Sequence, residues 1–175
     1  IYADAQSKPD IAINEMTRLI EQEKVDLILG VFSSGQCVPM AQMADAKKKM
    51  MWATICVASS VIKDKSLTHF FRVQVHSDQY GETSCRFLNE MSKAKLGKDP
   101  KDLKVAIIYE DGPYGAGIGA SNEINCKALG IQVVFKEGYS ATAPDLSTLV
   151  TKLRRARADV ILHTGYNPDI TLFWR

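Results

Sequence analysis

Short apolar runs alternate with amphipathic segments along nearly the whole chain, and this alternation constrains the fold more than any other feature. Apolar residues fill positions 25–32 almost without a break, as expected for a parallel strand buried on both faces. Strands are expected at 25–32, 50–57, 70–75, 105–109, 131–135 and 160–163, and helices at 7–22, 39–48, 78–94, 116–129, 145–156 and from 169 onward. This order predicts an α/β fold of three-layer architecture, with parallel sheets and helices on both faces.

Composition excludes several classes of partner. Of the 175 residues, 46% are hydrophobic and 24% are charged, which is ordinary for a soluble globular protein. The net charge of +2 gives no reason to expect nucleic acid as a partner. No apolar run approaches the roughly 20 residues of a membrane span, so no direct membrane insertion is expected. The chain begins without Met and ends inside an expected helix, which suggests a piece of a longer protein.

Four cysteines leave two interpretations open. None belongs to a C-x-x-C pair and no histidine stands at zinc-site spacing, so no metal is expected. Cys37 and Cys56 each follow an apolar run and could lie near one another. Free buried thiols are an equally good interpretation, so the cysteines do not settle the redox compartment.

The turns that follow the predicted strands are the places where a ligand site is expected, because open parallel sheets bind ligands at the carboxyl ends of their strands. The turns at 33–35 and 58–60 offer hydroxyls and backbone N–H groups near helix N-termini, which suits an anion such as a carboxylate. The turns at 110–115 and 164–166 each place a tyrosine beside a glycine, which suits an apolar wall with a polar tip. The alternative is that these residues only cap helices and form turns.

One motif favours a different function. Residues 115–120 match G-x-G-x-x-A and Glu137 follows twenty residues after Gly117, as in a dinucleotide fingerprint, so a nucleotide-dependent oxidoreductase is an alternative. However, the glycines begin six residues after the strand, and Glu110 and Asp111 would repel a pyrophosphate. The three histidines are isolated and no catalytic motif is present, so the chain is not expected to be an enzyme or to hold a cofactor.

Several motifs in order along the chain resemble one known family. They are Leu-Gly-Val-Phe-Ser-Ser at 29–34, Phe-Arg-Val at 71–73 with Gly81 beyond it, Asp-Gly-Pro-Tyr-Gly-Ala-Gly at 111–117, Asp-Leu-Ser-Thr-Leu at 145–149 and Thr-Gly-Tyr-Asn-Pro-Asp at 164–169. Together they are similar to the type I periplasmic binding proteins of the leucine/isoleucine/valine-binding class. That family accounts for the glycines of 115–120 as a turn and a helix start.

The resemblance implies an architecture and a function. The family fold has two α/β lobes joined by hinge strands that close on a ligand, so residues 1–73 would belong to lobe 1 and residues 74–175 to lobe 2, with the crossing at 73–77. The implied role is capture of an amino acid or another small carboxylate in the periplasm for uptake through the membrane permease of an ABC transporter. A ligand-sensing domain of a receptor or regulator with the same fold is a further alternative.

The resemblance also assigns candidate ligand contacts. The carboxylate-binding serine of the family falls on Ser34, and its second carboxylate-binding turn falls within 56–60, where this sequence departs from the family's P-A-x-T. The candidate set is Ser33, Ser34, Cys56, Ala58, Ser59, Tyr114 and Tyr166, with Phe32 and His76 as secondary members. The acidic residue that usually holds an amino group would lie beyond Arg175, so aromatic and other non-amino carboxylates are also expected as ligands.

Overall fold

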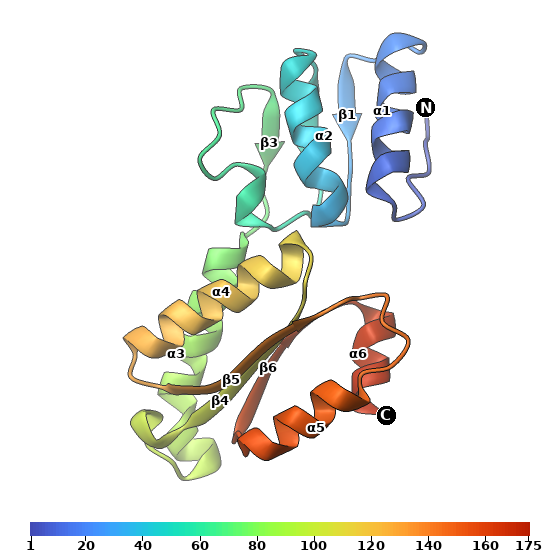
Figure 1. Cartoon of the computed structure of the whole chain (residues 1–175). Coiled ribbons are helices and arrows are strands. Elements are labelled where there is room, and N and C mark those ends of the chain that lie inside the picture. Colours follow the sequence, from blue (N-terminus) through green and yellow to red (C-terminus); the bar gives the residue numbers. More distant parts are fainter. The chain divides into compact units, whose positions relative to one another are not determined.

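The computed structural model describes residues 1–175 and divides into two compact units, Ile1–Val75 and His76–Arg175 (Figure 1). Each unit contains one three-stranded parallel sheet with its own helices. The crossing between lobes is expected at 73–77 from the resemblance, and a hinge at this position stays a prediction.

The first unit is built on a sheet of order β1-β2-β3. Its elements are α1 (Pro9–Glu21), β1 (Leu27–Leu29), α2 (Ser34–Ala46), β2 (Met50–Ala53), the short 3-10 helix η1 (Ser59–Val61) and β3 (Phe70–Arg72). The expected start of the second helix at Pro39 was wrong, because α2 begins at Ser34 and contains Pro39. Residues of α2 on both sides of this proline, including Cys37 and Met40, are buried in the core, so packing extends the helix past it.

Within these 175 residues, helices cover one face of the first sheet. Strand side chains Ile28, Met51 and Phe70 pack into one core with α1 and α2, which therefore lie on the same face. Side chains of the opposite face are exposed, among them Leu29 at 69% and Trp52 at 40%. Within these residues, the run 25–32 is therefore not buried on both faces as expected, and β1 is only three residues long.

The second unit is built on a sheet of order β5-β4-β6. Its elements are α3 (Ser77–Leu96), the 3-10 helix η2 (Pro100–Asp102), β4 (Lys104–Glu110), α4 (Pro113–Ala128), β5 (Gln132–Tyr139), α5 (Ser147–Ala156), β6 (Val160–Thr164) and α6 (Asn167–Trp174). All strand pairs are parallel. The predicted alternation of strand and helix is thus confirmed in this unit.

Helices cover both faces of this second sheet. Val105 and Ile107 of the central strand β4 belong to a core that includes Cys85 of α3 and Cys126 of α4. Ala106 and Ile108 point to the other face, into a core with Leu149 of α5 and Phe173 of α6. All four strand residues are fully buried, so β4 has the double-sided burial that a continuous apolar run indicates.

Both units contain a disulfide. Cys37 of α2 is bonded to Cys56, which follows β2, and Cys85 of α3 is bonded to Cys126 of α4. No free cysteine remains. Of the two interpretations left open by the sequence, the structure has the bonded form.

Candidate functional site

At the carboxyl edge of the first sheet, the turns after β1 and β2 meet through a hydrogen bond. Ser34 is the first residue of α2, and its Oγ accepts a hydrogen bond of 3.2 Å from the backbone N–H of Ala58. Both residues are buried, Ser34 at 2% exposure. The structure therefore brings together two of the predicted site residues from turns 24 residues apart in the chain.

The local chemistry of this edge suits an anion. Because the Ser34 oxygen accepts a hydrogen bond from the N–H of Ala58, its own hydroxyl can donate a hydrogen bond to a ligand oxygen. The first N–H groups of a helix have no partner within the helix, and they concentrate positive potential at its N-terminus. Residues 30–44 and 54–63 contain no Asp or Glu that would oppose a bound carboxylate.

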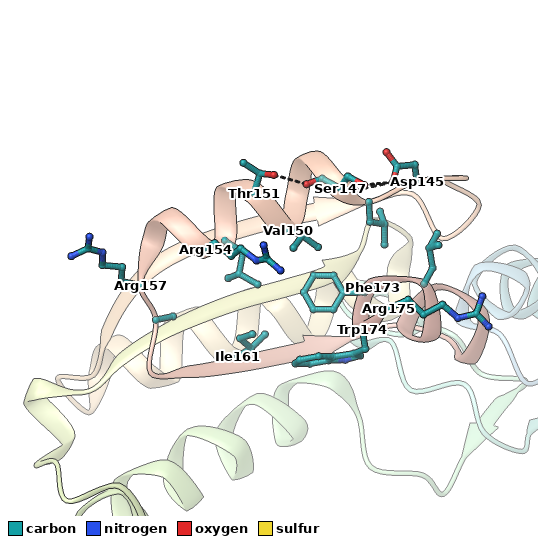
Figure 2. A pocket seen from close by; sticks show the side chains of 14 residues that line it. Asp145, Ser147, Val150, Thr151, Arg154, Arg157, Ile161, Phe173, Trp174 and Arg175 are labelled. Carbon is teal, nitrogen blue, oxygen red and sulfur yellow. Dashed lines mark hydrogen bonds between the residues drawn. The ribbon is translucent and has the colours of Figure 1, made fainter.

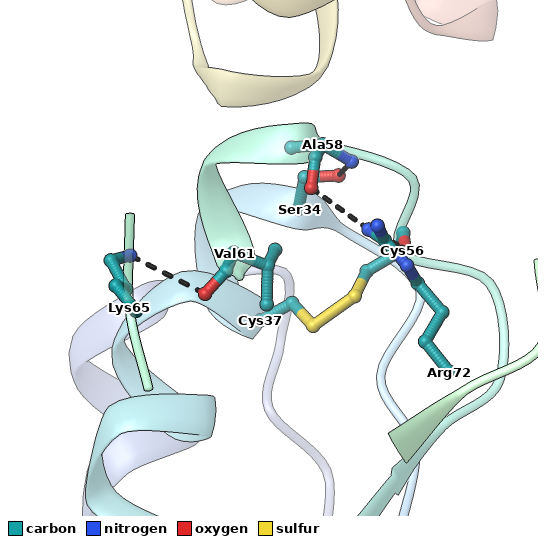
Figure 3. Close-up of a disulfide and its surroundings, with 7 residues drawn as sticks. All are labelled: Ser34, Cys37, Cys56, Ala58, Val61, Lys65 and Arg72. Atoms are coloured by element: carbon teal, nitrogen blue, oxygen red, sulfur yellow. Dashed lines mark hydrogen bonds between the residues drawn. A yellow bond between two sulfur atoms is a disulfide. The ribbon is translucent and has the colours of Figure 1, made fainter. Parts of the chain in front are cut away.

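Other predicted members of this edge differ in how they could act. Cys56 is buried and its sulfur is bonded to Cys37, so any contact that it makes with a ligand is through its backbone (Figure 3). Ser33 precedes α2 and Ser59 begins η1, and both are half-buried. Phe32 is 62% exposed.

At the carboxyl edge of the second sheet, two predicted tyrosines contact each other. Tyr114 lies in the first turn of α4 and Tyr166 immediately precedes α6. Their ring centroids are 5.4 Å apart, with the rings tilted by 43°. Burial raises the pKa of the Tyr114 hydroxyl above its ordinary value. The pair is an aromatic surface with polar tips.

The glycine motif at 115–120 is not a phosphate-binding loop. All six residues lie inside α4. The buried carboxylate of Glu110 accepts hydrogen bonds from the N–H groups of Gly112, at 2.7 Å, and Gly115, at 2.6 Å. A pyrophosphate would need these same N–H groups, so an internal carboxylate already occupies the position that the dinucleotide alternative requires.

Packing explains the glycines of α4 instead. A Cβ on Gly119 would overlap the ring of Tyr109 on β4, and a Cβ on Gly117 would press on the side chain of Ser77 at the start of α3. These positions allow α4 to lie close to its neighbours, which is a structural reason for the spacing.

A hydrogen-bond network of three side chains, which was not predicted from the sequence, holds the backbone N–H of Tyr166. The hydroxyl of Tyr139 donates to Asp169 Oδ2 at 2.6 Å and lies 2.7 Å from His163 Nε2, while Asp169 Oδ1 accepts the backbone N–H of Tyr166 at 2.9 Å. Burial and the bond to Asp169 raise the pKa of Tyr139, and burial lowers the pKa of His163. Because the Tyr139 O–H points to Asp169, the Tyr139 oxygen can accept a hydrogen bond from His163 in the neutral tautomer that carries its proton on Nε2. Asp169 stands three residues after Tyr166, which is the spacing of a helix capping box, so the sequence could have predicted its hydrogen bond to the N–H of Tyr166.

His76, a secondary candidate, precedes α3. Its backbone N–H donates to the side chain of Gln79 at 3.0 Å, as in a capping box. The structure thus gives this residue a role at the start of α3, and a ligand contact stays a prediction.

Two hollows lie in the second unit. The larger, of about 590 Å³, lies between α5 and α6, and Figure 2 shows Phe173, Val150 and Ile161 pointing into it. None of the predicted site residues lines it. The smaller, of about 320 Å³, is lined by residues that include Tyr114, Tyr80, Asn122 and His163. Of these two hollows, only the smaller is lined by a predicted ligand contact, Tyr114.

The structure contains no group of three or more His, Cys, Asp or Glu side chains placed to hold a metal ion. None of its helices has both the length and the apolar composition needed to cross a bilayer.

Comparison with known proteins identifies relatives along the whole chain. A family model described as periplasmic binding protein matches residues 1–175. Leu/Ile/Val-binding protein homolog 7 of Brucella suis biovar 1 (strain 1330) and homolog 8 of Brucella abortus (strain 2308) are each 36% identical over 162 residues, which is 93% of this chain. The chain spans 40% of the length of these relatives.

Solved structures share the fold. Leucine binding protein LivK of Thermotoga maritima MSB8 matches with a TM-score of 0.84 and 23% identity, over 98% of this chain and 46% of that one. A solute binding protein of an ABC transporter from Rhodopseudomonas palustris HaA2, in complex with p-hydroxybenzoic acid, matches with a TM-score of 0.84 and 19% identity, over 99% of this chain and 45% of that one. With the family model matched from the first residue to the last, this chain belongs to the periplasmic binding proteins.

Proposed function

We propose that the full-length protein is the solute-binding component of an ABC transporter, and that it captures an amino acid or another small carboxylate, aliphatic or aromatic, for uptake. The observation that supports this proposal is the buried hydrogen bond between Ser34 and Ala58, which joins the two turns that were predicted to bind an anion. The names of the relatives support it, since they refer to leucine, isoleucine and valine, and one structural neighbour holds a hydroxylated benzoate.

Ser34 and the neighbouring backbone N–H groups would take the carboxylate. Each hydrogen bond to a charged group contributes roughly 1.5–3 kcal/mol, and the absence of acidic side chains from 30–44 and 54–63 leaves this attraction unopposed. Ser33, Ser59 and the backbone of Cys56 are the adjoining candidates. The proposed function is binding and not catalysis, and it requires no cofactor.

Tyr114 and Tyr166 would contact the remainder of the ligand. Their paired rings suit an aliphatic or aromatic side chain, and their hydroxyls suit a polar substituent on it. The network of Tyr139, His163 and Asp169 would hold Tyr166 in place by fixing the backbone N–H of that residue.

The proposed location is the periplasm and the proposed partner is a membrane permease. Both follow from the family, and the two disulfides support the location because structural disulfides persist in oxidising compartments.

A ligand screen on the full-length protein tests the proposal. Thermal shift against L-leucine, other amino acids, p-hydroxybenzoate and NAD should show stabilisation by one carboxylate class, of about 2.7 kcal/mol at 100 times its Kd. Ser34→Ala should lower the affinity for that ligand about tenfold or more. Ser147→Ala is the matched control, because Ser147 is also the first residue of a helix, α5, in the other unit. Stabilisation by NAD alone would overturn the proposal.

A further inference from the structure

The loop that carries Ala58 is fastened at three points, all within the first unit. Cys56 is bonded to Cys37 of α2, the N–H of Ala58 donates to Ser34, and Arg72 at the end of β3 donates from Nη1 to the carbonyl oxygens of Cys56, at 3.2 Å, and Ala58, at 2.8 Å. Figure 3 shows these groups converging on the same short segment. We call this arrangement, Cys37–Cys56 with Arg72, the loop clamp.

Beyond these three points, the loop is held by core packing of Cys56 and Ala58 and by one turn hydrogen bond, from the N–H of Val61 to the Ala58 carbonyl oxygen at 3.3 Å. Residues 54–58 follow β2 and precede η1 without belonging to a helix or strand, so no ladder hydrogen bonds fix their backbone. Cys56 and Ala58 are nonetheless buried, at 1% and 0% exposure. A buried carbonyl needs a donor, and the guanidinium of Arg72 supplies one to two carbonyls at once.

The clamp acts on the group that the proposed function uses. Ala58 must stay next to Ser34 for the serine oxygen to accept its N–H and leave the hydroxyl proton for a ligand. The disulfide fixes the loop to α2, the helix that begins with Ser34, and Arg72 fixes it to the end of β3. A site held in its binding geometry before the ligand arrives binds more tightly, because less ordering remains to be done.

We propose that the Arg72 guanidinium and the Cys37–Cys56 disulfide are positioning groups for the carboxylate site, which hold Ala58 against Ser34 while neither the guanidinium nor the two sulfurs contact the ligand. This inference rests on the proposed function. It predicts that loosening either fastening makes residues 54–58 mobile and lowers carboxylate affinity, even where the fold survives.

The second disulfide provides a matched control. Cys85–Cys126 joins α3 to α4 in the other unit, whereas residues 54–58 belong to the first. Removing it should lower stability but leave the loop and the affinity unchanged. A comparison of the two disulfides therefore separates positioning from a general loss of stability.

The experiment uses the full-length protein and two readouts. Amide hydrogen exchange of peptides covering 54–60 is measured without ligand, and Kd is measured by calorimetry for L-leucine and p-hydroxybenzoate. The variants are Cys37→Ser with Cys56→Ser, Arg72→Gln, Arg72→Lys, and Cys85→Ser with Cys126→Ser. Arg72→Gln keeps both disulfides, so the test does not depend on the cysteine variants folding.

The rate of amide hydrogen exchange at 54–58 should rise about tenfold or more in the Cys37/Cys56 double variant and in Arg72→Gln. Both variants should also bind whichever of the two probes is a ligand with a comparably lower affinity. Arg72→Lys should keep part of the protection from exchange and part of the affinity, since an ammonium can still donate to one carbonyl. Unchanged exchange in both loosened variants, or an equal rise in the Cys85/Cys126 variant, would overturn the clamp. Exchange is measured without ligand, so failure of both probes to bind the unmodified protein would count against the proposed function alone.

Discussion

The two parallel sheets differ in how their faces are covered, although each is built from three strands. In the second unit, neighbouring residues Ile107 and Ile108 of β4 are both fully buried on opposite faces. In the first unit, Met51 of β2 is fully buried while the adjacent Trp52 is 40% exposed. A continuous apolar run therefore indicates a strand, but it does not by itself say how many of the strand's faces are covered.

The two disulfides differ in a parallel way. Cys85–Cys126 joins two helices within the core of the second unit, whereas Cys37–Cys56 fastens a loop of the first unit beside the candidate carboxylate site. We therefore expect both crosslinks to contribute to stability, and the one in the first unit to contribute also to the geometry of the candidate site. This contrast, like that of the sheets, can be measured.

Alanine substitutions on adjacent strand positions should show the largest difference between the units. In the 175-residue chain, Ile107→Ala and Ile108→Ala should each lower the free energy of unfolding by about 2–5 kcal/mol, because each leaves a cavity in a filled core. Met51→Ala should cost a similar amount, but Trp52→Ala less than about 1 kcal/mol. Urea unfolding measures these losses. An equal loss for Met51→Ala and Trp52→Ala would contradict the one-sided sheet.

Removing each disulfide should lower stability by different amounts. The bonded cysteines are 41 residues apart in the second unit and 19 in the first. On the chain-entropy model the losses are about 4 and about 3 kcal/mol, because the longer loop restricts the unfolded chain more. Unfolding of the two serine double variants, followed by Trp174 for the second unit and Trp52 for the first, measures the losses. A larger loss in the first unit would show that the entropy of the unfolded chain is not the controlling factor.

Lowering the pH should reduce the stability of the second unit before that of the first. We expect this effect to be smaller than those of the alanine substitutions and of the disulfide removals. Burial holds the pKa of His163 in the folded protein below its ordinary value of about 6.5, so the unfolded chain binds more protons than the folded one between these two pKa values. The contribution of neutral His163 is therefore complete above about pH 6.5 and is lost as pH falls towards the lowered pKa. The melting temperature reported by Trp174 should drop by a few degrees between pH 7.5 and 5.5.

The control for this pH effect is His163→Gln, which should melt at a lower temperature but without the drop between pH 7.5 and 5.5. The melting temperature reported by Trp52 in the first unit should change less over the same range. A drop that persists in His163→Gln would assign the pH dependence to another group.

Much of the candidate site follows from local sequence. Hydroxyl and glycine turns after apolar runs placed Ser34, Ala58, Tyr114 and Tyr166 at the carboxyl edges of strands, and the structure brings the first two, and the last two, into contact. The supporting groups were not predicted. Arg72 lies 14 residues from Ala58, and Tyr139 lies 30 residues from Asp169, so no local pattern connects them.

The sequence by itself determined the α/β order, the parallel strands and the turns that carry ligand-binding chemistry, because hydrophobic periodicity and turn residues act over a few neighbouring positions. The tertiary structure alone decided which sheet is covered on both faces, that Cys37 is bonded to Cys56, and that Glu110 occupies the helix terminus where the glycine motif suggested a phosphate. Such outcomes depend on the free energy of contacts between distant segments, which a short stretch of sequence does not contain.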